Sequence, residues 1–184
     1  MARLPYVDPE AMKPAVREVY DRLPVKINIF RMMPHAETCY RPLLSLGTAV
    51  LFRQDLDARL RELAILRVAN LSRAGYEWAQ HVPIAKSVAA TDEQIAALER
   101  GDAEASCFSD DDKLVLRFAT ELVRDVRVSD ETFARAKSRF SDREIVELIL
   151  AVGYYMMIAR LLETTGVDLE EVAGGKLYES VSKR

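Results

Sequence analysis

The sequence is poor in residues that break helices and in residues that form cross-links. It has seven glycines, seven prolines, two cysteines and two histidines among 184 residues. Cys39 and Cys107 lie far apart, which fits neither a disulfide framework nor a Cys-x-x-Cys redox pair. Because no segment alternates at period two with β-branched residues, strands are not predicted. We therefore expect an all-α protein in a reducing compartment.

The chain also lacks the signals of nucleic-acid binding, export and membrane insertion. Its net charge of −3 and pI near 5.6 give no basic surface for nucleic acid. The N-terminal "MARLPYVDPEAMKPAV" has no apolar core, so no signal peptide is predicted. The longest apolar run, "ELILAVGYYMMIARLL", contains charges and is expected to be too short to span a bilayer. These features predict a cytoplasmic protein.

The composition is otherwise that of a globular domain with a sizeable core. Hydrophobic residues make up 49% of the chain and charged residues 30%. The length suits one domain. We expect an N-terminal arm and helix over residues 1–26, a helical domain over 27–166, and a C-terminal tail over 167–184. The tail is expected to be loosely held or to reach onto a neighbouring subunit.

Helix start and stop signals recur along the chain. Asp8 precedes a proline and is expected to cap a helix. Thr91 and Gln94 form a capping-box pattern, Ser72 is expected to cap the helix after it, and Gly166 suits a C-terminal stop. The expected helices span residues 8–23, 34–52, 56–70, 73–89, 92–100, 109–126, 129–140 and 141–165.

A weak internal repeat links two apolar segments. "LRELAILRVA…YEWAQH" resembles "DREIVELILA…YYMMIAR", so that Glu62 aligns with Glu144. The second copy has a shorter turn, and Met156 and Arg160 stand where the first copy has an acid and a histidine. Amphipathic composition alone also produces such a likeness. The sequence therefore leaves open whether the domain holds two related helical hairpins.

Three polar residues, Glu62, Glu77 and His81, lie in this mostly apolar stretch. Glu62 and His81 are at similar distances from a turn near residues 70–72, and at ~1.5 Å per residue they face each other in an antiparallel hairpin. Glu77 and His81 are four residues apart and share a helix face. A carboxylate beside an imidazole can form a tuned acid–base pair.

A structural reading of the same residues stays open. A Glu–His pair at this spacing is often a solvated contact worth ~0.3–0.5 kcal/mol. Against that reading, Glu62 lies in a helix that is apolar nearly all round, where a carboxylate needs a partner. Two carboxylates and one histidine are a weak ligand set, so no metal is expected.

The remaining polar residues have simpler explanations. The two cysteines are expected to be small buried hydrophobes, and His35 a local cap or packing residue. Arginines recur on the Glu62 helix, and they either pair with carboxylates at a subunit contact or hold a substrate anion. These arginines are Arg59, Arg61 and Arg67.

The stretches "LRELAILRVANLSRAGYEWAQHVPIAKSVAATDEQIAAL" and "DDDKLVLRFATELVRDVRVSDETFARAKSRFSDREIVEL" resemble the carboxymuconolactone decarboxylase family, which includes the alkylhydroperoxidase AhpD-like proteins. The resemblance extends over roughly residues 27–166. The peroxidase branch has a Glu, a Cys-x-x-Cys pair and a His. Glu62 and His81 match its outer members, but its cysteines would fall at Ala74 and Glu77. The chain therefore resembles the cysteine-less decarboxylase branch, which has a carboxylate four residues before the histidine.

The resemblance implies an AhpD-like helical bundle that forms a trimer or hexamer. It also implies a cofactor-independent carboxy-lyase or proton-transfer enzyme acting on a small carboxylated unsaturated or lactone-type substrate. We expect His81 to handle the proton, Glu62 to orient it across the hairpin, and Glu77 to hold it from the same helix. Trp78 and Tyr76 are expected to line an apolar substrate pocket.

Two other functions remain. A thiol-dependent, peroxiredoxin-type peroxidase needs an attacking and a resolving thiol close together, so it would have to recruit Cys39 or Cys107. A non-enzymatic helical oligomer would bind a ligand at the same place without proton chemistry.

Overall fold

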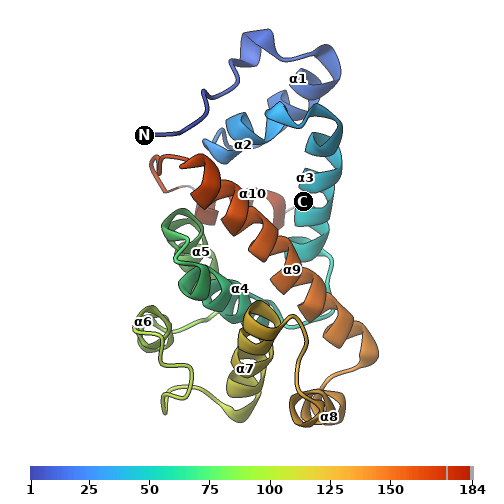
Figure 1. Ribbon diagram of the computed structural model, residues 1–184, viewed down its shortest axis with the longest axis vertical. Coiled ribbons are helices and arrows are strands. Elements are labelled where there is room, and N and C mark those ends of the chain that lie inside the picture. Colours follow the sequence, from blue (N-terminus) through green and yellow to red (C-terminus); the bar gives the residue numbers. More distant parts are fainter. Residues whose placement is uncertain (173, 183–184) are drawn as a thin grey trace.

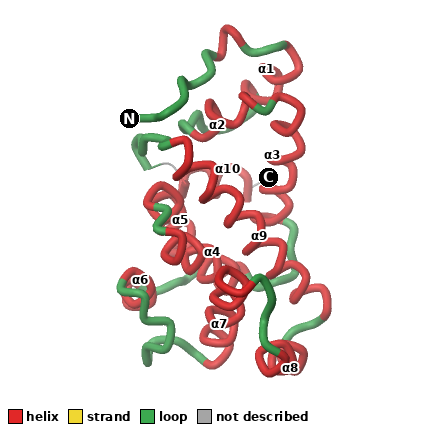
Figure 2. Tube along the Cα trace, viewed as in Figure 1, coloured by secondary structure: helices red, strands yellow, loops and turns green. Residues whose placement is uncertain are grey.

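A computed structural model describes residues 1–172 and 174–182 of the chain. The described residues form helices and loops without a strand, which confirms the all-α prediction (Figures 1 and 2). Short 3-10 turns lie at Pro9–Ala11 and Met33–His35. The helices are α1 Pro14–Asp21, α2 Ile29–Met32, α3 Glu37–Phe52, α4 Ala58–Ser72, α5 Gly75–Ser87, α6 Asp92–Glu99, α7 Asp110–Asp125, α8 Asp130–Arg139, α9 Asp142–Thr165 and α10 Gly174–Ser182.

Most of the predicted helix boundaries are confirmed. Thr91 and Gln94 form the capping box of α6, and Gly166 ends α9 in the left-handed conformation at φ 63°. Asp8 does cap a turn, but that turn is 3-10 and α1 starts later. The prediction for Ser72 is wrong, because α4 continues through it and ends at Arg73, which adopts the left-handed conformation.

Helix α4 forms the centre of the molecule. It packs against α5, α7 and α9 (Figure 1). Leu63, Ala64, Ile65 and Leu66 are four consecutive residues without exposed surface. An isolated surface helix would expose at least one of four consecutive positions, so α4 is buried all round, as its composition predicts.

Helix α9 is one continuous helix of 24 residues. The second hairpin that the repeat would require is therefore absent from the described chain, and the repeat is not confirmed. The expectation that this run is too short to cross a membrane is also wrong, because α9 reaches a mean hydropathy of 1.9 over a sufficient length. Half of that window is buried inside the protein, as in the core helix of a soluble fold.

The C-terminal segment is held against the bundle. The side chain of Glu170 accepts hydrogen bonds from Tyr76 and Gln80, and the amide of Gly174 donates to Gln80 Oε1 over 2.7 Å. A Cβ at Gly174 would lie 1.9 Å from the Gln80 carbonyl oxygen, so only glycine allows this contact. The expected loose tail is wrong for residues 174–182, and residues 183–184 lie outside the described chain.

Candidate functional site

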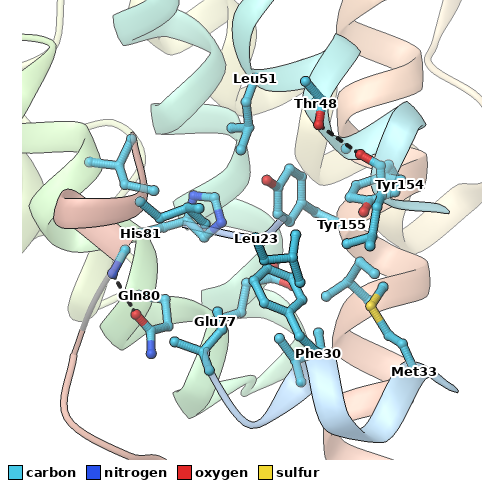
Figure 3. Close-up of a pocket in the computed structure, with 18 of the residues that line it drawn as sticks. Leu23, Phe30, Met33, Thr48, Leu51, Glu77, Gln80, His81, Tyr154 and Tyr155 are labelled. Atoms are coloured by element: carbon cyan, nitrogen blue, oxygen red, sulfur yellow. Dashed lines mark hydrogen bonds between the residues drawn. The ribbon is translucent and has the colours of Figure 1, made fainter. Parts of the chain in front are cut away.

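A cavity of about 190 Å³ lies between α2, α3, α5, α9 and α10 (Figure 3). Its wall is mostly apolar, with Phe30, Leu51 and Ile158 among the lining residues. A cavity of roughly 150 Å³ is enough to hold benzene. The space therefore suits one small ring with a few substituents.

Glu62 and His81 form a hydrogen-bonded pair at this cavity. The distance from His81 Nδ1 to Glu62 Oε2 is 2.8 Å, as the hairpin geometry of α4 and α5 predicts. The guanidinium of Arg61 donates to the other oxygen, Glu62 Oε1, over 3.3 Å. Because the carboxylate accepts, Nδ1 carries the proton and Nε2 is the imidazole atom left for a ligand.

The His81 ring is also fixed by packing. The ring of Tyr155 meets it edge-on, with centroids 4.6 Å apart and planes at 82°. Glu62 has no exposed surface and His81 is 7% exposed. A buried carboxylate that orients a histidine in this way is the arrangement of a positioned acid–base group.

Glu77 lines the same cavity, but its carboxyl is not bonded to the imidazole. Neither Oε1 nor Oε2 has a hydrogen-bond partner in the described part of the chain. Burial raises the pKa of Glu77 well above its ordinary value, and the charges of Glu163 and Glu62 raise it further. The predicted role of holding His81 is therefore wrong, and Glu77 instead presents a carboxyl of raised pKa to the cavity (Figure 3).

The tyrosines of the wall stay protonated. Burial raises the pKa of Tyr154 to about 12, and burial raises the pKa of Tyr155 well above its ordinary value. The Tyr154 hydroxyl donates to the carbonyl of Leu43 over 3.1 Å. The tyrosine hydroxyls of the wall therefore act as neutral hydrogen-bonding groups near neutral pH.

The two aromatic residues predicted to contact substrate differ in position. Tyr76 lines the cavity, with its hydroxyl 2.8 Å from Glu170 Oε1. The prediction that Trp78 lines the cavity is wrong, because its side chain packs against a second core cluster that includes Leu63 and Leu98. The side chain of Trp78 is therefore not part of the cavity wall, whereas those of its neighbours Tyr76 and Glu77 are.

Several cavity residues were missed at the level of sequence. They come from α2, α3 and α9, far from the hairpin along the chain, and include Phe30, Thr48, Tyr154 and Tyr155. The Tyr154–Tyr155 pair follows an exposed glycine in an apolar helix, and its spacing carries no signal of a ligand site. Only the three-dimensional packing of α9 on α5 brings these residues to His81.

The arginines of α4 make contacts within the chain. Arg59 pairs with Asp112 over 2.8 Å, and Arg67 donates to the hydroxyl of Thr120 over 2.9 Å. Arg61 donates to Glu62, as described above, so each of the three arginines has a partner within the chain. None of them lines the cavity, and no other arginine or lysine of the described chain does so. The alternative that one of them holds a substrate anion has no support in this arrangement.

The remaining candidate groups lie elsewhere. Cys39 is exposed, against the expectation of burial, and Cys107 is half-buried. Burial raises the pKa of the Cys107 thiol, and neither cysteine lines the cavity. His35 is exposed, and its Nε2 lies 2.7 Å from the carbonyl oxygen of Pro5, outside the cavity. In the described residues no three His, Cys, Asp or Glu side chains gather as a metal site would require.

Solved structures of similar fold cover nearly the whole chain. An AhpD-core peroxidase-related protein from Ralstonia eutropha JMP134 superposes with a TM-score of 0.79 at 16% identity, covering 96% of this chain and 94% of that one. A peroxidase-related protein from Silicibacter sp. TM1040 gives 0.79 at 14% identity, with 96% and 95% covered. A debrominase in complex with 2,3,4-tribromopyrrole gives 0.70 at 14% identity, with 97% and 95% covered. These likenesses confirm the AhpD-like fold.

The sequence itself matches a family model. The model of the carboxymuconolactone decarboxylase family matches residues 38–121, which include α4, α5 and the Glu62–His81 pair. No curated protein matches the chain. The resemblance seen in the sequence is thereby confirmed.

Proposed function

We propose that this chain, whose residues 38–121 belong to the carboxymuconolactone decarboxylase family, is a cofactor-independent enzyme for proton transfer or decarboxylation. Its substrate is a small carboxylated, unsaturated or lactone-type molecule. One observation carries the proposal: the imidazole of His81, held by the buried carboxylate of Glu62, lines a mostly apolar cavity.

The residues supply the parts of such a reaction. When the bond to the carboxylate carbon breaks, CO₂ leaves and the electron pair stays on the substrate. The imidazolium of His81 then gives its proton from Nε2 to carbon, while Glu62 holds Nδ1 and balances the charge. The neutral imidazole regains its proton from water, so one proton is consumed for each CO₂ released.

The apolar wall favours the loss of CO₂. A lysine or arginine beside the substrate carboxylate would stabilise the charge that the reaction removes, and the described wall has neither. Exclusion of water acts in the same direction. The charged carboxylate is strongly hydrated in water and is destabilised in an apolar cavity, whereas neutral CO₂ is only weakly hydrated and is not.

A thiol peroxidase is the less favoured function, although related structures are peroxidase-related proteins. Ala74 and Glu77 occupy the positions where the resemblance would place its cysteines. Replacing Cys39 and Cys107 together by serine should leave turnover unchanged. Loss of activity in a correctly folded double variant would favour the peroxidase instead.

The central test replaces the proton-handling group. A substrate is first identified by screening carboxylated lactones and unsaturated ring-cleavage products for CO₂ release or proton exchange. His81→Gln should then reduce turnover by about 10²–10⁴-fold, the usual contribution of a positioned acid–base residue. Circular dichroism and elution volume should be unchanged. Near-normal turnover in this variant would refute the proposal and leave a ligand-binding oligomer as the better description.

A further inference from the structure

Glu77 is a buried acid that the mechanism above does not use. It is 2% exposed, and in the described chain both of its oxygens lack hydrogen-bond partners. Buried polar atoms are nearly always paired, and leaving one unpaired destabilises the fold. Here the unpaired atoms border a cavity large enough for a ring, so a bound molecule can supply the missing partner.

The surroundings decide what kind of partner fits. The described wall of the cavity contains no lysine or arginine, and the charges acting on Glu77 are those of Glu163 and Glu62. A neutral carboxylic acid among such neighbours donates one strong hydrogen bond, and it favours an acceptor on which negative charge develops. A carbonyl oxygen that becomes an enolate is such an acceptor.

The position of His81 relative to Glu77 adds a second constraint. The two residues lie one turn apart on the same face of α5, about 6 Å along the helix axis at ~1.5 Å per residue. Both border the same cavity (Figure 3). A ring between them can present a carbonyl oxygen to the acid and a carbon conjugated with that carbonyl to the imidazole.

We propose that Glu77 binds a carbonyl oxygen of the substrate and stabilises the enolate that forms on it during the proposed reaction. Loss of CO₂, or of a proton to His81, leaves an electron pair on carbon. That pair delocalises onto the carbonyl oxygen, to which Glu77 donates. The proton from His81 then goes to carbon, and the carboxyl keeps its own. A donor placed where charge develops acts in the transition state.

The reaction itself rests on the proposed function, but the binding role can be tested without a substrate. Phenols are planar rings whose oxygen resembles that of an enolate, and 4-nitrophenol reports its own binding by its absorbance. Wild-type protein should bind it saturably. Glu77→Leu should weaken binding about ten- to hundredfold, the range expected for a hydrogen bond to a charged group.

The matched control is Glu163→Gln, which also removes a carboxylate but at an exposed position of α9 outside the cavity. It should bind 4-nitrophenol with nearly wild-type affinity, because it removes a charge that acts on Glu77 but leaves the hydrogen-bond donor in place. A thermal melt of each variant shows that loss of binding does not reflect unfolding. Equal affinities in Glu77→Leu and Glu163→Gln would overturn the inference, and so would the absence of saturable binding to the wild type.

Infrared difference spectroscopy provides a readout that a purely structural role would not change. The carbonyl stretching band of a protonated carboxylic acid should shift when 4-nitrophenol binds, and it should be missing from Glu77→Gln. An unshifted band would overturn the inference. Failure of the proposed function gives a different result from failure of this inference. In that case His81→Gln would keep normal turnover, while Glu77→Leu would still weaken the binding of 4-nitrophenol.

Discussion

Replacing Glu77 by glutamine should stabilise the fold, and the gain should increase with pH. In the unfolded chain this carboxyl ionises near its ordinary pKa of 4.5, whereas burial raises the pKa well above that value in the folded protein. The neighbouring charges of Glu163 and Glu62 act in the same direction, and the described cavity wall has no lysine or arginine to oppose them. Keeping the proton above pH 4.5 therefore costs the folded state free energy.

The sign and size follow from linkage. Because the folded pKa is the higher one, the contribution of Glu77 to stability is fully present below pH 4.5 and is lost as pH rises towards the folded pKa. The loss is about 1.4 kcal/mol for each pH unit in that window. The loss continues until pH reaches the folded pKa, so the difference between wild type and Glu77→Gln in the midpoint of thermal unfolding should grow over the same pH range.

Urea unfolding followed by circular dichroism at pH 4.5, 5.5 and 6.5 measures this difference. The free energy of unfolding of Glu77→Gln should exceed that of the wild type by an amount that grows across the series. Glu163→Gln, the matched exposed change, should show a much smaller effect, through the charge it removes from near Glu77. Parallel pH profiles for wild type and Glu77→Gln would refute the conclusion that the buried carboxyl is un-ionised.

Three further outcomes are expected. Combining Glu62→Gln with His81→Gln should reduce turnover no further than either change alone, because the pair acts as a unit; additive losses in steady-state kinetics would contradict this. Gly174→Ala should detach α10, seen as faster proteolysis of the C-terminal segment, since its Cβ has no room. The homo-oligomer is expected to use the outer face of α9, so Leu150→Glu with Met157→Glu, both exposed apolar positions, should lower the mass measured by light scattering.

Local signals in the sequence were sufficient for much of the fold. The side chains of caps such as Thr91 and Gln94 form hydrogen bonds with backbone amides within four residues, so these caps can be recognised from the sequence alone. The Glu62–His81 contact is almost as local, because one short turn fixes the two helices that carry it. Boundaries failed where tertiary contacts decided them, as at Ser72, where packing carries α4 through a residue that is a good N-cap.

The wall of the cavity could not be derived in the same way. Tyr154 and Tyr155 reach His81 only because α9 crosses the hairpin, and α10 closes the cavity through a glycine contact with Gln80. Neither contact has a periodic signature. Trp78 shows the opposite error, since aromatic character suggested a substrate contact while its angle on α5 places it in another core cluster.

Position 77 shows how one residue can change the chemistry of a site in which the Glu62–His81 pair is kept. The resemblance to the peroxidase branch places its cysteines at Ala74 and Glu77, and of these only Glu77 borders the cavity. The Glu62–His81 pair does not depend on which group stands there, because its hydrogen bond crosses from α4 to α5 without contacting that residue. A thiol at this position would offer a nucleophile to an oxidant, whereas an un-ionised carboxyl offers only a proton and a hydrogen bond. Under the proposed function, position 77 therefore supplies a hydrogen-bond donor at the place where the resemblance puts a redox thiol.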